Sequence, residues 1–345
     1  MHVTPSTAAS RQPAPPVRPT GHPDHGTSPA QRVVGAGLAA LGGLAIAVQG
    51  RINGQLGASL HDGMVAALIS FGVGLVLLLA TVPTTAAGRR GLARLLAALR
   101  AGRLRWWQCL GGMCGAYLVT TQGLTVSLLG VAVFTVAVVG GQVISSLAVD
   151  RAGFGPAGPQ PLTRPRVIGA VLGLVAVVVA VSDEFGHPDQ LWWAALPALA
   201  GLGLAWQQAV NGRVRVASDH TMVATLVNFT TGTAALLLVC AVDVLVRGWP
   251  TSAPQQWWLY VGGTLGIVAI GTAVVAVRLI GVLLLGLTSV AGQLLGAVLL
   301  DLVAPTDGGR ISAAGVAGTV VTLIAAAVAA LPSRRRRSAS RGASA

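Results

Sequence analysis

The sequence predicts an all-α polytopic membrane protein in which ten transmembrane helices form two inverted five-helix repeats. Three observations carry this prediction: the composition, the spacing of apolar segments, and a similarity between the two halves of the chain. Of the 345 residues, 53% are hydrophobic and only 10% are charged, and the mean hydropathy is +0.73. Because a water-soluble fold of this length could not bury so much apolar surface, the composition argues against a soluble enzyme.

Apolar segments of about the length that crosses a bilayer follow one another along most of the chain. The predicted spans are 33–50, 63–82, 106–126, 129–149, 166–183, 192–210, 221–245, 257–277, 280–300 and 312–331. Only Ser127-Leu128 separates the third span from the fourth, and only Arg278-Leu279 separates the eighth from the ninth. Each of these two pairs of spans is therefore predicted to form a tight antiparallel helical hairpin.

Polar segments lie at both ends of the chain and at its middle. Residues 1–31 are rich in Pro, Ser, Thr and His and are predicted to form a disordered cytoplasmic tail. The remaining predicted units are the first repeat 32–183, an extracytoplasmic linker 184–191, the second repeat 192–331 and an Arg-rich cytoplasmic tail 332–345.

The basic residues predict the orientation in the membrane. All 23 are Arg, and a cytoplasmic N-terminus places all but Arg51, Arg247 and Arg310 in cytoplasmic segments. This bias predicts a multi-pass protein of the bacterial cytoplasmic membrane, N-in and C-in, with membrane lipid as a partner and without nucleic acid. Tryptophan pairs at 106–107, 192–193 and 257–258 each open a span, as expected for anchors at the headgroup level.

The two halves of the chain resemble each other. Gln49 and Asn53 recur as Gln207 and Asn211, and MVAALISFGVG, which begins at Met64, recurs as MVATLVNFTTG. Further matches are WW-x3-GG-x2-G at 106 and 257, and Gly-Gln at 141–142 and 292–293. Because five spans is an odd number, the second repeat must enter the membrane from the opposite side. Inverted repeats are typical of transporters whose substrate site lies near the midplane, where the halves meet.

These motifs resemble a known family. QGRINGQL in the first half, the WW-x3-GG-x2-G opening of the third span and GGQVISSLAVD at the end of the fourth resemble the drug/metabolite transporter superfamily, and within it the YdcZ family of EamA-like proteins. The resemblance covers about residues 33–331 and is to the ten-span fused form. It implies a bacterial inner-membrane exporter of small organic metabolites or drugs. Asn228 has Ser70 opposite it in the first half, which implies an asymmetric site.

Polar residues inside the spans are the candidates for lining a substrate site, because such groups are costly in lipid and face the interior of the bundle. They are Gln49, Asn53, Gln142, Ser146, Gln207, Asn211, Asn228 and Gln293. The alternative is that these residues form interhelical hydrogen bonds with a structural role. Gln142 and Gln293 are favoured for substrate contact because the repeat places them at equivalent depths.

The only acidic candidates for ion coupling lie at span ends. Asp150 ends the fourth span and Asp301 ends the ninth, and helix-end capping is the competing interpretation. No catalytic residue, metal site or cofactor is predicted, because the chain has no GxxxxGK[ST], HExxH, GxSxG or CxxC motif.

The predicted function is secondary transport of a small-molecule substrate by alternating access, with spans one, four, six and nine lining a midplane cavity. The alternative is a channel or a sensory or structural membrane protein without active transport. An intact repeat pair is compatible with a functional monomer, and a homodimer stays open.

Overall fold

The structure is a computed structural model that describes residues 28–180, 193, 195–248, 254–303 and 313–331. The side chains of residues 122–136, 177, 180, 247, 297, 301, 313–316 and 319 are not among those described. Most of the predicted N-terminal tail, the linker 184–191 and the C-terminal tail therefore lie outside the described residues.

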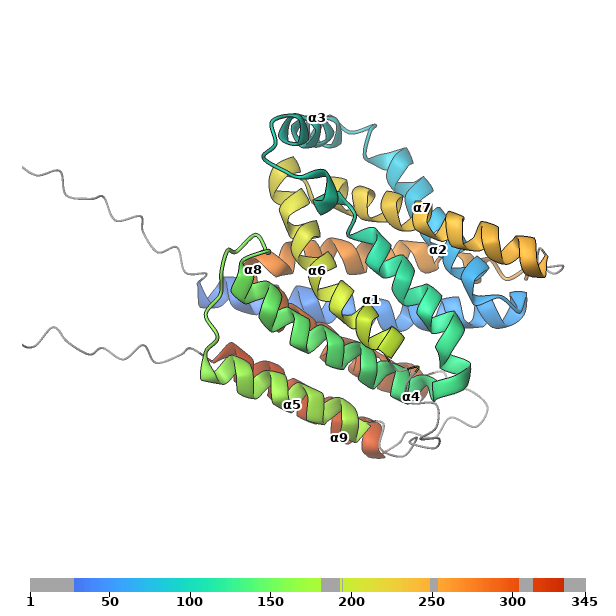
Figure 1. The fold of residues 1–345 in the computed structure, drawn as a ribbon. Helices are drawn as coiled ribbons and strands as arrows, with labels where there is room; N and C mark the ends of the chain where they lie inside the picture. The colour runs from blue at the N-terminus through green and yellow to red at the C-terminus, as the bar shows by residue number, and fades with distance from the viewer. Residues whose placement is uncertain (1–27, 181–192, 194, 249–253, 304–312, 332–345) are drawn as a thin grey trace, which may run out of the picture.

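The described part of the chain forms a bundle of helices (Figure 1). In chain order these are α1 Pro29–Leu60, α2 Gly63–Thr81, α3 Ala86–Arg100, η1 Trp106–Cys109, α4 Gly112–Ala152, α5 Arg164–Ala180, α6 Ala195–Ser218, α7 Thr221–Arg247, η4 Trp257–Tyr260, α8 Gly262–Val303 and α9 Ala313–Ala330. Segments long and apolar enough to cross a membrane, among the residues searched, are Pro29–Leu60, Gly63–Thr81, Thr221–Val246 and Trp257–Leu300. The all-α fold class predicted from composition is confirmed.

The two predicted hairpins are present as long helices that fold back on themselves. In α8 the break lies at Gly281, whose φ of 77° and ψ of 174° are not helical. In α4, Cys114 packs on Gly203 of α6, while Ser145 donates a hydrogen bond to the carbonyl of the adjacent Leu202 at 3.0 Å. A straight helix would separate Cys114 from Ser145 by about 46 Å. The chain of α4 must therefore turn back, so that both of its arms lie beside the same part of α6, as Figure 1 shows.

The first helix of each half packs against the hairpin of the other half. α1 runs along both arms of α8, and α6 runs along both arms of α4. Glycines permit these contacts: a Cβ at Gly43 would lie 2.0 Å from the carbonyl oxygen of Ser289, and one at Gly201 would lie 1.9 Å from that of Val138. Because these are backbone atoms, any side chain at either glycine would force the helices apart.

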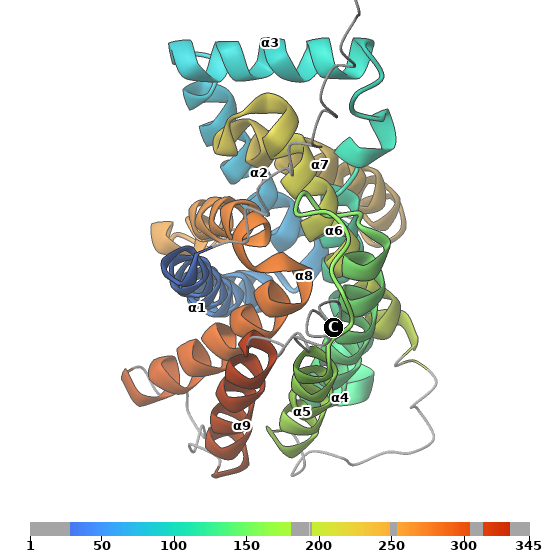
Figure 2. The same cartoon turned by 90° about the vertical axis from the view of Figure 1, so that its left-hand side faces the viewer.

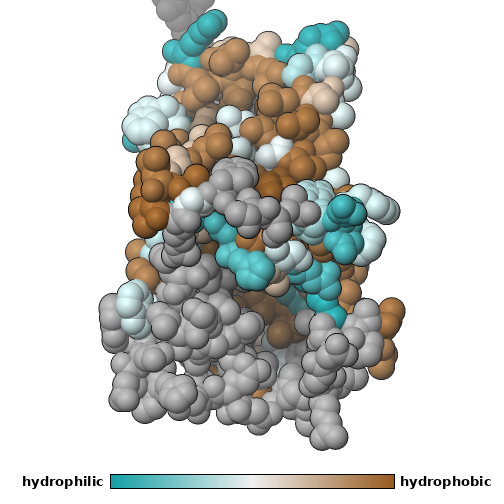
Figure 3. Space-filling model, turned by 90° about the vertical axis from the view of Figure 1, so that its right-hand side faces the viewer, coloured by the Kyte–Doolittle hydropathy of each residue, from teal (hydrophilic) through white to brown (hydrophobic). Residues whose placement is uncertain are grey.

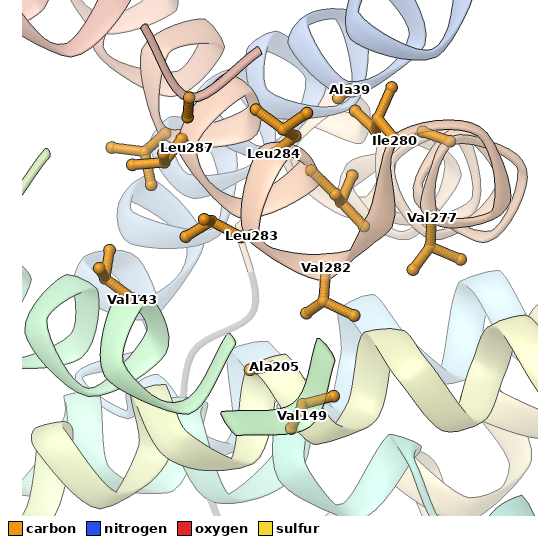
Figure 4. Packing of buried hydrophobic residues seen from close by; sticks show 14 of the residues in the cluster. Ala39, Val143, Val149, Ala205, Val277, Ile280, Val282, Leu283, Leu284 and Leu287 are labelled. Atoms are coloured by element: carbon orange, nitrogen blue, oxygen red, sulfur yellow. The ribbon is translucent and has the colours of Figure 1, made fainter. Parts of the chain in front are cut away.

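The largest hydrophobic cluster fills the space where the halves meet. Val282 and Leu283, at the start of the second arm of α8, face Val149 and Val143 of α4, with Ala205 of α6 beside them (Figure 4). All five are at most 6% exposed. Burial at this seam therefore joins the two halves into one core.

Large apolar side chains also cover the outside of the bundle, as Figure 3 shows for one face. Leu238 is 74% exposed, Leu245 86% and Val303 81%. Exposed apolar surface on this scale is unfavourable in water and is expected where a helix faces lipid.

The predicted link between the second and third spans contains a helix that the apolar pattern did not indicate. α3 lies across one end of the bundle (Figure 2), and the residue before it, Thr85, caps its start by accepting a hydrogen bond from the Gly88 amide through its hydroxyl at 3.0 Å. Its buried positions, Gly88, Gly91, Leu95 and Ala98, follow helical spacing, whereas its arginines are exposed. α3 is therefore an amphipathic helix at the end of the bundle.

Candidate functional site

Three predicted site residues form an amide cluster in the second half that we call closed because Asn228 bridges α6 and α7, although the buried Gln207 Oε1 atom has no hydrogen-bond partner among the described residues. The Asn228 side-chain oxygen on α7 accepts hydrogen bonds from Asn211 at 2.8 Å and from Gln207 at 3.2 Å, both on α6. The three residues are 1%, 3% and 5% exposed, respectively. Asn228 therefore links α7 to α6 by accepting hydrogen bonds from two amide groups of α6 that would otherwise be buried without an acceptor.

The equivalent cluster in the first half is open. Gln49 and Asn53 on α1 correspond to Gln207 and Asn211, but Ser70 on α2 stands where Asn228 would be. The Asn53 Oδ1 and Ser70 Oγ atoms are buried and have no hydrogen-bond partner among the described residues. Since a serine hydroxyl is shorter than an asparagine amide, it does not close the bridge. Buried polar groups left in this state are rare and point to a ligand or to a strained arrangement.

The side chains of each amide cluster contact the glycines of a GxxxG motif in the other half. A Cβ at Gly262 would lie 2.2 Å from the Asn53 Oδ1 atom, and one at Gly111 would lie 2.6 Å from the Asn211 Oδ1 atom. Gly266 and Gly115, one turn further on, face Gln49 and Gln207 in the same way. The glycines thus let polar side chains of one half approach the hairpin backbone of the other half.

Two phenylalanines pack against each other between the two amide clusters. The rings of Phe71 on α2 and Phe229 on α7 have centroids 5.3 Å apart and are tilted by 39°. A Cβ at Gly266 would lie 3.1 Å from Phe229, and one at Gly115 would lie 3.6 Å from Phe71. The aromatic pair therefore lies between the open and the closed cluster. The two phenylalanines were not among the predicted site residues, although they occupy equivalent positions in the two repeats.

Gln142, Ser146 and Gln293 lie apart from the amide clusters. Ser146 donates to the carbonyl of Gln142 at 2.6 Å, and both side chains face Gly286 of α8. Gln293 is half-buried on α8, where its backbone approaches Gly43. Neither glutamine side chain forms a hydrogen bond to the amide clusters in the described part of the chain. The structure thus brings together five of the eight candidates: Gln49 and Asn53 in one cluster, and Gln207, Asn211 and Asn228 in the other.

Asp150 caps a helix of the other half. Its carboxylate accepts hydrogen bonds from the amides of Val282 at 2.9 Å and Leu283 at 3.1 Å, the first residues after the break in α8. It also forms an ion pair with Arg166 of α5. This arrangement matches the helix-capping interpretation, whereas a role in ion coupling stays a prediction. The side chain of Asp301 lies outside the described residues.

Charged groups gather at the end of the bundle where α3 lies. Arg94 of α3 pairs with Asp219 in the turn between α6 and α7 at 2.7 Å. Arg215, outside the predicted span 192–210, donates to the Thr221 hydroxyl at 3.1 Å. Burial lowers the pKa of the Arg215 guanidinium, nearby Arg278 lowers it further, and Asp219 opposes the shift. Among the residues searched, His, Cys, Asp and Glu form no group of three that could hold a metal ion.

These features define an all-α polytopic membrane protein with a two-repeat architecture of the drug/metabolite transporter type. The family model described as "Putative inner membrane exporter, YdcZ" matches residues 34–179 and again residues 192–328. The chain belongs to the YdcZ family. The family is therefore one of inner-membrane exporters and not one of enzymes.

Comparison with solved structures supports the fold. Twenty-two chains of solved structures match this chain. One of them, described only as "Crystal structure of protein", superimposes with a TM-score of 0.59 at 21% sequence identity, covering 90% of this chain and 99% of the other. At this identity the likeness shows the fold alone. No curated protein matches the chain.

Proposed function

We propose that this protein exports small organic solutes by alternating access, in which the two interlocked halves rock around the site between the amide clusters. The observation that carries the proposal is the open cluster of Asn53 and Ser70, whose buried polar atoms lack partners. Membership in a family of inner-membrane exporters supports the direction of transport. The positive-inside distribution of arginines supports an N-in, C-in orientation.

The two clusters take different roles in this proposal. The closed cluster of Gln207, Asn211 and Asn228 keeps α6 and α7 together as a rigid pair. The open cluster offers a carbonyl oxygen and a hydroxyl to a polar group of the substrate. The rings of Phe71 and Phe229 offer an apolar surface beside it.

The substrate class follows from the charge of this site. The residues that form the two clusters and the aromatic pair are all uncharged, so a charged solute would lose its hydration without gaining a counter-ion. Burial of an unpaired ion costs much more than burial of a hydrogen-bonded neutral group. We therefore expect a neutral solute with a hydrogen-bonding group and an apolar portion.

The test is solute counterflow into proteoliposomes that contain the purified protein, across a panel of neutral metabolites and drugs. A transporter exchanges labelled for unlabelled solute and saturates, whereas the alternative, a channel, shows neither exchange stimulation nor saturation. Ser70→Asn should abolish counterflow, because it closes the open cluster as Asn228 closes the other. Gln293→Ala, away from both clusters, is the matched control. Full counterflow by Ser70→Asn would contradict the proposal.

A further inference from the structure

A cavity of about 600 Å³ lies between α3, η1 and the end of α6. Its polar lining comes from Arg94, Arg103, Gln108, Arg213 and Asp219. Three guanidinium groups therefore face one carboxylate, and the cavity carries a net positive charge. It lies outside both amide clusters, and the proposed transport function makes no use of it.

The hydrogen bonds of these residues show which donors stay available. Arg94 pairs with Asp219, and Arg213 donates to the carbonyls of Gly153 and Phe154. Gln108, only 8% exposed, accepts a hydrogen bond through Oε1 from the Arg105 amide at 2.9 Å, and its NH2 group has no acceptor among the described residues. Arg103 is exposed and forms no hydrogen bond or ion pair with the described residues.

An apolar groove of about 510 Å³ adjoins this cavity. It is lined by Leu99 and Leu104, by Trp106 and Trp107, and by Gly102 and Arg105. Leu104, which is only 3% exposed, lines both the cavity and the groove, so the two lie next to each other. Trp106 is 72% exposed, and Trp107 stacks on Trp206 of α6 with ring centroids 6.1 Å apart. A basic cavity thus opens beside an apolar groove with tryptophans at its edge.

We propose that this composite site binds one anionic phospholipid. The phosphate accepts hydrogen bonds from Arg103 and Gln108, and an acyl chain lies in the groove beside Trp106. Basic pockets of membrane proteins bind anionic headgroups, and tryptophan prefers the headgroup level. A free phosphate would use the cavity but would leave the groove empty, so the groove favours a lipid.

The location gives the lipid a structural effect. α3 belongs to the first half, and its Arg94 contacts Asp219 of the second half. A lipid held between Arg103 and the end of α6 would add to this contact and keep α3 on the turn that joins α6 to α7. The segment between α7 and η4 of the second half is much shorter than that between α2 and η1, so the site is expected only at this end.

The test is a thermal-shift titration of the detergent-purified full chain with dioleoyl phosphatidylglycerol, dioleoyl phosphatidylcholine, dihexanoyl phosphatidylglycerol and inorganic phosphate. We expect the Tm to rise with dioleoyl phosphatidylglycerol at concentrations at least tenfold lower than with the other three. Equal effects of the two dioleoyl lipids would overturn the proposal. An equal effect of inorganic phosphate would replace the lipid by a free anion and would overturn it too.

Variants locate the site. Arg103→Gln should lose the selective response at least tenfold in apparent affinity, whereas Arg100→Gln, an exposed arginine of α3 that does not line the cavity, should keep it. Both remove one positive charge, so their difference separates a specific site from a general attraction. Native mass spectrometry of the same variants should count one retained lipid fewer for Arg103→Gln. Equal responses of the two variants would overturn the assignment.

Discussion

The contact of Asp150 with the other half gives the sharpest stability prediction. Asp150→Ala removes the acceptor of the Val282 and Leu283 amides and the counter-ion of Arg166. Loss of a helix-capping acceptor costs about 0.5–2 kcal/mol. Loss of one partner of a buried ion pair costs about 3–5 kcal/mol, because the other charge stays buried alone. Since the Arg166 and Asp150 side chains are 11% and 4% exposed, both losses apply and we expect about 3.5–7 kcal/mol in total.

The measurement is reversible unfolding in detergent micelles, followed by tryptophan fluorescence, for a double-mutant cycle. The cycle comprises Asp150→Ala, Arg166→Met and the double variant, with Asp150→Asn retaining the capping oxygen but not the charge. We expect the double variant to be less destabilised than the sum of the single ones, because Arg166→Met removes the unpaired charge. A loss below about 1 kcal/mol for Asp150→Ala, or additive effects in the cycle, would refute the reasoning.

Three further predictions concern the glycines and the amide clusters. Gly43→Leu should prevent α1 from packing on α8, because the new side chain would collide with the Ser289 carbonyl. Gly37→Leu should be tolerated, because Gly37 faces open space. Size-exclusion chromatography should show a folded monodisperse protein for Gly37→Leu only. Asn228→Ser should lower the Tm, because it leaves the Gln207 and Asn211 amides unpaired at about 1–3 kcal/mol. Gly281→Ala should destabilise by about 1–3 kcal/mol in the same unfolding assay, because its φ of 77° and ψ of 174° form a conformation that essentially only glycine adopts.

The arrangement of spans could largely be predicted because hydropathy reports the segments that face lipid. The short links 127–128 and 278–279 correctly indicated two hairpins. Hydropathy does not report where a helix ends, and for this reason the first span was predicted to stop at residue 50 although α1 continues to Leu60. Its polar continuation packs against η4 and the start of α8 and so stays helical. α3 was missed because its apolar face is too narrow to resemble a span.

The candidate site could be predicted only in part. Gln207, Asn211 and Asn228 were recognisable one by one, as polar residues in apolar surroundings. Their hydrogen-bonded arrangement depends on how α6 and α7 pack, which a single sequence does not give. The repeat match favoured Gln142 and Gln293 by depth alone, yet the two lie apart from the amide clusters. Phe71 and Phe229 looked like ordinary core residues, because an aromatic side chain in an apolar run carries no sign of a site.

The interlocking of the halves explains why two similar repeats can diverge without losing the fold. Contacts at Gly43 and Gly201 are backbone contacts, so they depend on the absence of a side chain and are the same in both halves. The polar clusters instead depend on the residue at one position, where Ser70 replaces the bridging amide of Asn228. The backbone contacts at these glycines therefore fix how the halves fit together, while the residue at one position determines whether the polar cluster is bridged, and in our proposal this leaves the first-half cluster to bind the substrate.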